Sequence, residues 1–181
     1  MQINRRLMLQ ASLLLPALAA SAAARLANAQ GLTGPAYEVT PWSGPVSSLG
    51  LVDTTGKTWQ LPDLQGRAVL LNFWASWCEP CRAEMPTLQQ VADLYGPDKL
   101  LVLAINFTES AARALQFAKT TGVSLPVLLD TTCKAAGQWC VKVFPTTLML
   151  DNRGQARHRV KGEVDWTSSA PGKLIEGLLK S

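Results

Sequence analysis

The chain carries the stretch AVLLNFWASWCEPCRAEMP at residues 68–86. Its first seven residues, Ala68–Trp74, are almost all apolar, which is typical of a strand buried on both faces of a sheet. From Cys81 onward, apolar residues recur every three or four positions, which predicts a helix that ends near Gly96. Two cysteines, Cys78 and Cys81, therefore lie where a buried strand turns into a helix.

The spacing of these two cysteines indicates a dithiol redox site. Unpaired backbone N–H groups and the positive end of the dipole favour a thiolate at a helix start, so Cys78 is predicted to be the nucleophile. Cys81 lies one turn further along and can attack a mixed disulfide formed on Cys78, so it is predicted to be the resolving thiol. Pro80 stands in the first turn, where its fixed φ suits a helix and stiffens the turn.

Two metal-binding alternatives use the same spacing. A zinc site would need Cys133 and Cys140 to complete a set of four sulfur ligands. The gap between those two cysteines is wider than the usual zinc spacing, and Pro80 lies inside the first pair. A haem-attachment motif would need histidine where Arg82 stands. The sequence therefore favours redox chemistry by the thiols themselves, with no metal and no other cofactor.

The remaining pattern alternates strands and helices. Two short strands, at residues 46–51 and 58–61, flank the turn Asp53–Gly56 and predict an N-terminal β-hairpin. Further strands are predicted at residues 100–106, 127–129, 146–150 and 156–160, and helices at residues 110–120, 133–139 and 174–179. Strands that alternate with helices, followed by a hairpin and a last helix, indicate an α/β fold, a three-layer α/β/α sandwich with a mixed sheet.

The N-terminus has the features of an export signal. Arg5 and Arg6 precede a long apolar stretch that reaches Ala27-Asn28-Ala29, a small-x-small pattern suited to signal peptidase. We therefore expect residues 1–29 to be a cleaved signal peptide, with the twin-arginine and Sec routes both open. Without cleavage, the same stretch would tether the domain to the membrane. The cysteines would act in a compartment where disulfides persist.

Residues 30–45 are rich in Gly, Pro and Ala and show no sustained period, which predicts an irregular leader before one domain at residues 46–181. No second apolar stretch long enough to span a bilayer follows Gln30. Loss of the signal would lower the net charge from +4 to +1, and no basic run remains. Binding to nucleic acid is therefore not expected.

The stretch Trp74–Pro86 resembles the active-site signature of thioredoxin-fold proteins of the TlpA/ResA type. Phe144-Pro145-Thr146-Thr147 is similar to the segment that carries a cis-proline in that fold, and the resemblance extends over about residues 46–179 by order of elements. It implies a thioredoxin-like domain and an exported, periplasmic thiol–disulfide oxidoreductase. It also implies a membrane thiol donor of the DsbD/CcdA type and selected protein disulfides as substrates, such as those of apocytochrome c or of copper-assembly proteins.

The resemblance also assigns roles to residues around the thiols. A cis peptide bond before Pro145 would turn the backbone and expose Phe144 for pairing with a bound peptide. Packing in the core is the alternative role for Phe144. Trp77, Glu79 and Pro80 are the other residues that we expect to contact a substrate.

Two carboxylates lie close to the thiols in the sequence. Glu79 stands between the cysteines, and Glu84 follows Cys81 by three residues on the same helix face. A negative charge near a thiol raises its pKa and makes the couple more reducing, so the sequence favours a reductant over an oxidant. The resemblance implies that Glu84 belongs to the active site and moves a proton for Cys81. An ordinary solvated helix glutamate is the alternative.

Cys133 and Cys140 are the other two cysteines. In an unbroken helix their Cα atoms would lie about 10.5 Å apart, beyond the reach of about 7 Å for a disulfide. A structural disulfide between Cys133 and Cys140 would therefore need a helix that ends early. Two buried free thiols and an intermolecular role remain open beside it.

Two other functions have partial support. A peroxiredoxin-like thiol peroxidase shares the fold, but no Pro-x-x-x-Thr-x-x-Cys motif precedes Cys78. A copper-binding assembly chaperone of the Sco type uses two cysteines with three residues between them and a histidine, whereas His158 is the chain's one histidine. The motif therefore favours a dithiol oxidoreductase over both.

Overall fold

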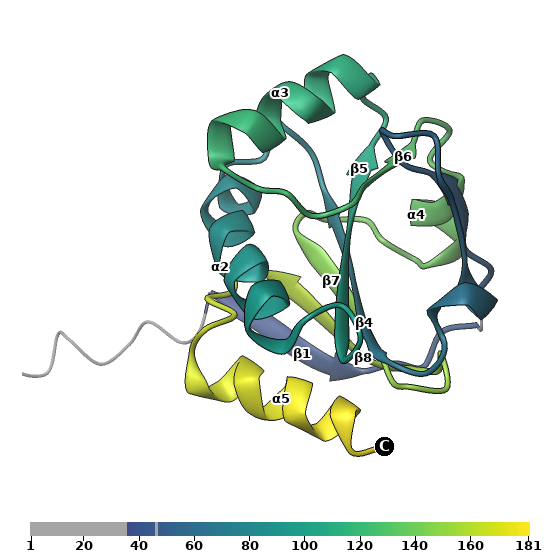
Figure 1. The fold of residues 1–181 in the computed structure, drawn as a ribbon, viewed down its shortest axis with the longest axis vertical. Helices are drawn as coiled ribbons and strands as arrows, with labels where there is room; N and C mark the ends of the chain where they lie inside the picture. The colour runs from purple at the N-terminus through teal and green to yellow at the C-terminus, as the bar shows by residue number, and fades with distance from the viewer. Residues whose placement is uncertain (1–35, 46) are drawn as a thin grey trace, which may run out of the picture. The chain divides into compact units, whose positions relative to one another are not determined.

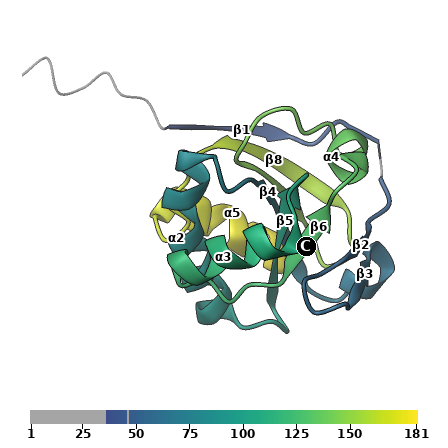
Figure 2. The same cartoon turned by 90° about the horizontal axis from the view of Figure 1, so that it is seen from above.

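The structure is a computed structural model that describes residues 36–45 and 47–181. Its main sheet has six strands in the order β1-β8-β7-β4-β5-β6 (Figure 1), and a separate two-stranded hairpin, β2-β3, is labelled in Figure 2. The strands are β1 Tyr37–Pro41, β2 Gly50–Val52, β3 Thr58–Gln60, β4 Ala68–Trp74, β5 Leu100–Phe107, β6 Val127–Asp130, β7 Thr146–Leu150 and β8 Ala156–Gly162. The helices are α2 Glu79–Tyr95, α3 Ala111–Thr121, α4 Lys134–Gln138 and α5 Ser169–Leu179, with a 3-10 turn η2 at Leu61–Leu64.

The strand β4 lies inside the sheet and is buried along its whole length. It runs parallel to β5 and antiparallel to β7, so its backbone groups are paired on both sides. Successive side chains of a strand point to opposite faces, and both faces of this sheet are covered. This accounts for the uninterrupted apolar pattern, and the predicted bounds Ala68–Trp74 are confirmed.

The two faces of the sheet are covered by different elements (Figure 1 and Figure 2). Helices α2, α3 and α5 pack on one face, where Leu70 and Trp74 of β4 belong to their hydrophobic cluster. Helix α4 and the β2-β3 hairpin pack on the other face, with Leu71 and Phe73. The predicted three-layer α/β/α sandwich with a mixed sheet is therefore confirmed, and a hairpin precedes β4, although its bounds differ from the predicted ones.

The leader predicted at residues 30–45 is not irregular throughout, because Tyr37–Pro41 form the edge strand β1. This strand pairs antiparallel with β8, and the compact unit spans Ala36–Ser181 rather than beginning at residue 46. Its partner strand lies more than a hundred residues further along the chain, so the local Gly and Pro content could not indicate the pairing. The predicted signal peptide, residues 1–29, lies outside the described residues.

Smaller differences concern element ends. The first strand of the hairpin begins at Gly50, later than predicted, and α5 begins at Ser169, five residues before the first residue of the predicted helix. The first turn of α5 contains Pro171, which suits a helix start but breaks the apolar period used to predict it. None of the helices in the described ranges combines the length and the apolar character that crossing a membrane requires.

Candidate active site

The two cysteines of the motif form a disulfide at the start of α2. Cys78 is the N-cap residue of the helix, and its Sγ accepts a hydrogen bond from the backbone N–H of Cys81 at 3.3 Å. Pro80 lies in the first turn, where its missing N–H leaves no helical hydrogen bond unmade. Both sulfurs are therefore at the strand-to-helix turn where the sequence predicts them.

The two cysteines differ in their access to solvent. Cys78 is 6% exposed and Cys81 is 1% exposed. Around Cys78 lie the exposed side chains of Trp77, Glu79 and Pro80, and that of Trp77 is 61% exposed. A target disulfide can reach Cys78 before Cys81, and this order fits attack by Cys78 followed by resolution by Cys81.

The loop before β7 lies beside the dithiol, and its Phe144–Pro145 peptide bond is cis. The ring of Phe144 meets that of Trp77 edge-on with centroids 5.9 Å apart, and it lies 4.8 Å from the ring of Phe107. Phe144 is half-buried and packs against both hydrophobic clusters. Its backbone N–H and C=O make no hydrogen bond to another residue of the described ranges. The side chain therefore packs, while the backbone is available to pair with a peptide.

A buried polar network surrounds Glu84, which is 1% exposed. Its carboxyl accepts hydrogen bonds from Asn72 Nδ2 at 2.8 Å and from the backbone N–H of Val164 at 3.1 Å. Asn72 Nδ2 also donates to Thr147 Oγ1 at 3.0 Å. Asn72 and Thr147 were not predicted as site residues, although Asn72 is a polar residue in the middle of the apolar strand β4.

Burial raises the pKa of Glu84 to about 8, and the negative charge of Glu163 adds to the shift. The nearby indole of Trp166, the Val164 N–H and the Asn72 amide oppose it. Glu84 is therefore neither the solvated helix glutamate considered above nor a fixed negative charge at pH 7. It is mostly protonated there, and it can exchange a proton in the pH range where thiols titrate.

Glu79 is the carboxylate of the motif that stays at the surface. Its side chain is 86% exposed and its Oε2 lies 3.6 Å from Nε of Arg82, one turn along α2. Solvent and this partner screen the charge of Glu79, so its effect on the thiols is weaker than that of a buried group.

A second buried carboxylate, Glu109, was not predicted as part of the site. It follows β5 and accepts hydrogen bonds from the backbone N–H and the hydroxyl of Ser76, two residues before Cys78. Burial acts to raise its pKa, but hydrogen bonds from Ser76 and Asn106 and the charge of Arg113 hold the pKa below its usual value. No local pattern indicated Glu109, because it reaches the site through the parallel pairing of β4 with β5, which brings the carboxyl ends of both strands to one edge of the sheet.

Cys133 and Cys140 flank α4, and both are free, exposed thiols in the structure. Both adopt the left-handed backbone conformation, with φ of 57° and 51°. The structure therefore contains neither the Cys133–Cys140 disulfide nor the buried thiols considered above. Among the residues that the structure describes, no group of three or more His, Cys, Asp and Glu side chains is arranged to hold a metal ion.

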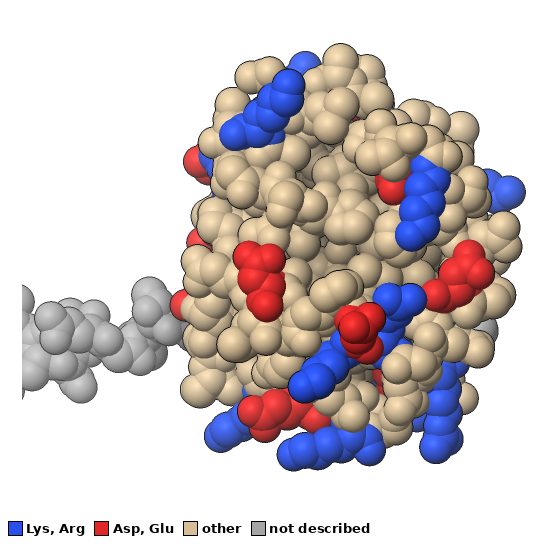
Figure 3. Space-filling model, in the orientation of Figure 1, with Lys and Arg blue, Asp and Glu red and all other residues tan. Residues whose placement is uncertain are grey.

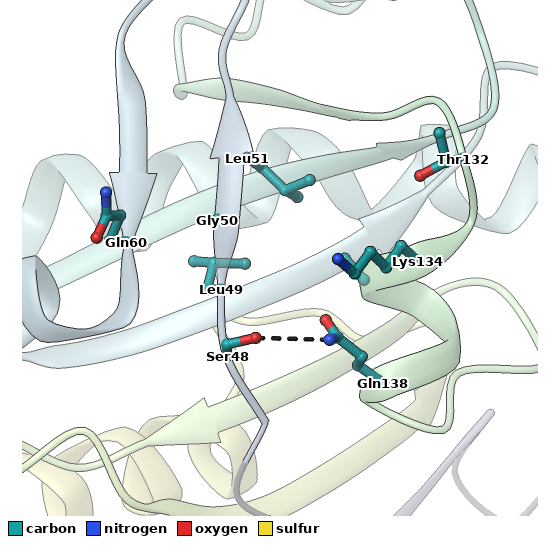
Figure 4. A pocket seen from close by; sticks show the side chains of 9 residues that line it. Ser48, Leu49, Gly50, Leu51, Gln60, Thr132, Lys134 and Gln138 are labelled. Atoms are coloured by element: carbon teal, nitrogen blue, oxygen red, sulfur yellow. Dashed lines mark hydrogen bonds between the residues drawn. The ribbon is translucent and has the colours of Figure 1, made fainter.

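Two hollows lie on the face of the sheet that carries α4. One, between the hairpin and α4, has a volume of about 260 Å³ and contains no residue of the dithiol site (Figure 4). Gln138 and Ser48 approach each other across it, with Nε2 and Oγ 3.5 Å apart. The other has a volume of about 420 Å³, lies next to the Phe144 loop and is lined by Cys140, Lys142, Val143, Thr146, Arg159 and Lys161.

The face seen in Figure 3 carries charges of both signs. Lys and Arg side chains are interspersed with Asp and Glu, and a broad area between them has no charged side chain. This face therefore presents no continuous basic surface of the kind that nucleic acid requires.

A dithiol that caps a helix after a buried strand, beside a cis-proline loop, defines the class of thioredoxin-like redox proteins. The model of the AhpC/TSA family matches residues 42–159, more than half of the chain, and the chain belongs to this family. Thiol-disulfide oxidoreductase ResA of Bacillus thuringiensis (strain Al Hakam) is 32% identical to it over 130 residues, which are 72% of each protein. The crystal structure of a DsbF homologue from Corynebacterium diphtheriae has a TM-score of 0.67 at 31% identity, and the match covers 81% of this chain and 96% of that one.

These similarities bear out the ResA/TlpA type that the motif indicates. ResA of Bacillus subtilis (strain 168) is 37% identical over 112 residues, which are 62% of this chain and 63% of that protein. The chain thus spans less than two thirds of the length of this relative.

Replacing Glu84 by glutamine should remove a pH dependence of stability. The folded-state pKa of about 8 exceeds the ordinary value of 4.5, so stabilisation that is fully present below pH 4.5 is lost as the pH rises to 8. Relative to Glu84→Gln, the free energy of unfolding of the wild-type oxidised protein should fall by up to about 4 kcal/mol between pH 5 and pH 8. Urea unfolding measures it, and Glu176→Gln, at an exposed site on α5, should keep the wild-type profile. Parallel profiles for wild type and Glu84→Gln would contradict the raised pKa.

Proposed function

We propose that the protein is an exported thiol–disulfide oxidoreductase that reduces selected protein disulfides through Cys78 and Cys81. The observation that carries this proposal is the disulfide at the start of α2, approached through Cys78 beside the exposed Trp77 and the cis-proline loop. Membership of the AhpC/TSA family and the similarity to relatives named thiol-disulfide oxidoreductase support it.

The reaction proceeds in two exchange steps. The Cys78 thiolate of the reduced protein attacks one sulfur of a target disulfide, the target S–S bond breaks, and the released target sulfur takes a proton. Cys78 is then joined to the target by a mixed disulfide. Cys81 gives up its proton and attacks the Cys78 sulfur, which releases the second target thiol and forms the Cys78–Cys81 disulfide. Two electrons have then passed from the protein to its target.

Glu84 has the properties of the proton acceptor for Cys81. It lies three residues further along the same face of α2, and a pKa of about 8 is close to that of an ordinary thiol. General bases act best when their pKa is near that of the group they deprotonate and near the working pH. The Asn72 amide and the Val164 N–H already point at the carboxyl and would stabilise it once it is ionised.

The target peptide pairs with the backbone of Phe144 and packs on the two aromatic rings. Among the described residues, the backbone N–H and C=O of Phe144 have no hydrogen-bond partner. An extended peptide gains affinity from such main-chain hydrogen bonds, and the side chains beside them add specificity. Trp77 and Phe144 supply an apolar contact directly beside Cys78. Selectivity among disulfides therefore comes from this aromatic pair.

The acidic surroundings favour donation of electrons. Glu109 is ionised and contacts Ser76, two residues before Cys78, whereas the charge of Glu79 is screened at the surface and Glu84 is mostly protonated at pH 7. Carboxylates disfavour the thiolate and so destabilise the reduced form, which makes the couple more reducing. A protein that donates electrons repeatedly needs a source, and the resemblance to the TlpA/ResA type points to a membrane thiol donor of the DsbD/CcdA type.

Export and substrate follow from the sequence features and the family resemblance. The charged start, the apolar stretch and the small-x-small pattern in residues 1–29 support passage to the periplasm, either free after cleavage or tethered. In that compartment a disulfide in the haem-binding CxxCH pair of an apocytochrome, or in a copper-assembly protein, is a target that needs a reductant.

A thiol peroxidase and a copper chaperone are less well supported. Residues 71–78 lack the Pro-x-x-x-Thr-x-x-Cys motif of a peroxidatic cysteine. His158 lies on β8 and belongs to no group of three metal-ligand side chains among the described residues. The Cys78–Cys81 disulfide instead fits a dithiol couple.

The reduction potential of the Cys78/Cys81 couple should be that of a reductant. Equilibration with glutathione buffers, followed by quantification of free thiols, measures it. We expect a value closer to that of thioredoxin, about −270 mV, than to that of the strong oxidant DsbA, about −120 mV. A potential close to the DsbA value would overturn the assignment as a reductant.

Substitution of Cys81 should trap the protein on its target. Cys81→Ser leaves Cys78 free to form the mixed disulfide but removes the thiol that resolves it, whereas Cys78→Ser should form none. Both variants are made with Cys133→Ser and Cys140→Ser, because those two exposed thiols would otherwise react. Non-reducing gel electrophoresis with an oxidised CxxCH peptide detects the adduct. Equal trapping by both variants would show that the assigned roles are wrong.

Removal of the Phe144 ring should weaken docking but leave the thiol chemistry unchanged. An aromatic contact of this kind contributes about 1 kcal/mol, so Phe144→Ala should raise the KM for a protein disulfide roughly fivefold to tenfold. The reduction potential and the kcat should stay close to wild type. The matched control is Leu94→Ala, at a residue that is 76% exposed in the last turn of α2. If KM rises no more than in the control, Phe144 does not contact the target.

A further inference from the structure

The turn between β4 and α2 carries Cys78. Within it, the backbone N–H of Cys78 donates to the carbonyl of Ala75 at 3.1 Å, which closes a tight turn. Trp77, the residue immediately before Cys78, exposes most of its side chain. The position of Cys78 therefore depends on how Ser76 and its neighbours are anchored from the inside.

That anchor is the carboxylate of Glu109. Its Oε2 accepts the backbone N–H of Ser76 at 2.7 Å, and its Oε1 accepts the Ser76 hydroxyl at 2.5 Å. Asn106 Nδ2 donates to the same Oε2 at 2.8 Å and orients the carboxylate from the end of β5. A buried carboxylate with both oxygens engaged by one residue holds that residue's backbone and side chain together.

Arg113, in the first turn of α3, completes the arrangement. Its Nε lies 2.9 Å from Glu109 Oε1 and donates to the Ser76 hydroxyl oxygen at 2.8 Å. The Arg113 charge and the hydrogen bonds from Ser76 and Asn106 outweigh burial and keep Glu109 ionised, with its pKa below the usual value. The turn before Cys78, the end of β5 and the start of α3 therefore meet at one carboxylate.

We infer that Glu109 is a positioning residue of the dithiol site, which acts through Ser76 to hold Cys78 against Cys81 and to keep the couple reducing. This inference rests on the proposed function. Two physical effects work in the same direction. A turn of fixed geometry keeps the thiols of Cys78 and Cys81 close together, which raises their effective concentration and so stabilises the disulfide. A buried negative charge that contacts Ser76, two residues before Cys78, disfavours the Cys78 thiolate and so destabilises the reduced form.

The test compares the reduction potentials of wild type and Glu109→Gln in glutathione buffers. Glutamine keeps the size of the side chain but removes its charge. Its NH₂ group is a donor and cannot accept the hydrogen bonds that the replaced carboxylate oxygen accepted from Ser76 and Asn106. We expect the equilibrium constant for forming the Cys78–Cys81 disulfide to fall about tenfold, which is a rise of about 30 mV in potential. Glu176→Gln, the same substitution at the exposed site on α5, should leave the potential unchanged.

A purely structural role for Glu109 would lower the thermal midpoint of unfolding and leave the potential of the folded protein at the wild-type value. An unchanged or lower potential in Glu109→Gln therefore overturns the inference, whatever happens to stability. If Glu109→Gln does not fold, Ser76→Ala takes its place. That variant keeps the Ser76 N–H bond and loses the hydroxyl, so its equilibrium constant should fall about twofold to threefold. No change in it would also overturn the inference.

The proposed function and this inference fail in different ways. A wild-type potential near that of DsbA contradicts the function as a reductant. A reducing wild type whose potential does not respond to Glu109→Gln or Ser76→Ala contradicts only the role of Glu109.

Discussion

The hydrogen bond from the backbone N–H of Cys81 to Sγ of Cys78 is the interaction on which the site depends. The first N–H groups of a helix have no partner within the helix, and here a sulfur takes the place that a serine or aspartate oxygen usually occupies. The cap starts α2 and directs an N–H donor at the sulfur of Cys78, the nucleophile of the proposed reaction. The buried strand β4 brings the chain to this point, and paired strands on both sides fix where it ends. The same hydrogen bond therefore caps the helix and contacts the sulfur of Cys78.

Two buried carboxyl groups lie beside this cap, and their surroundings drive their protonation in opposite directions. Glu84 has one amide, one backbone N–H and no cation in hydrogen-bond contact, so burial dominates and its pKa rises to about 8. Glu109 is also buried, but the Arg113 charge and three hydrogen bonds from Ser76 and Asn106 hold its pKa below the usual value. Two carboxyl groups whose environments give them different pKa values can serve different chemical roles. Glu84, which titrates near neutral pH, can carry a proton. Glu109, which stays ionised, can hold the Ser76 backbone and place a negative charge near the dithiol.

The parts of the fold that could be predicted from the sequence are those specified by local pattern. The bounds of β4 follow from an unbroken apolar run, and the helix start at Cys78 and the cis bond at Pro145 follow from recognisable local motifs. The parts that could not be predicted depend on partners far along the chain. β1 is a strand because β8 offers it an edge, and Glu109 matters because parallel pairing of β4 and β5 brings it to Ser76. Glu84 was predicted as a site residue, but its protonation required the knowledge that it is buried.

Limited access to Cys78 fits the proposed function of a selective reductant. In a compartment where disulfides persist, an electron donor that reacted with every disulfide would be oxidised without result. Cys78 is almost fully buried, and the edge-on pair of Trp77 and Phe144 stands beside it. Under the proposed function, a target must therefore bring a disulfide in an extended segment that fits these rings and pairs with the backbone of Phe144 before exchange begins. When binding must precede reaction, targets that bind well and targets that bind poorly differ in their rates of disulfide exchange. A poorly matched disulfide does not come within reach of the Cys78 sulfur.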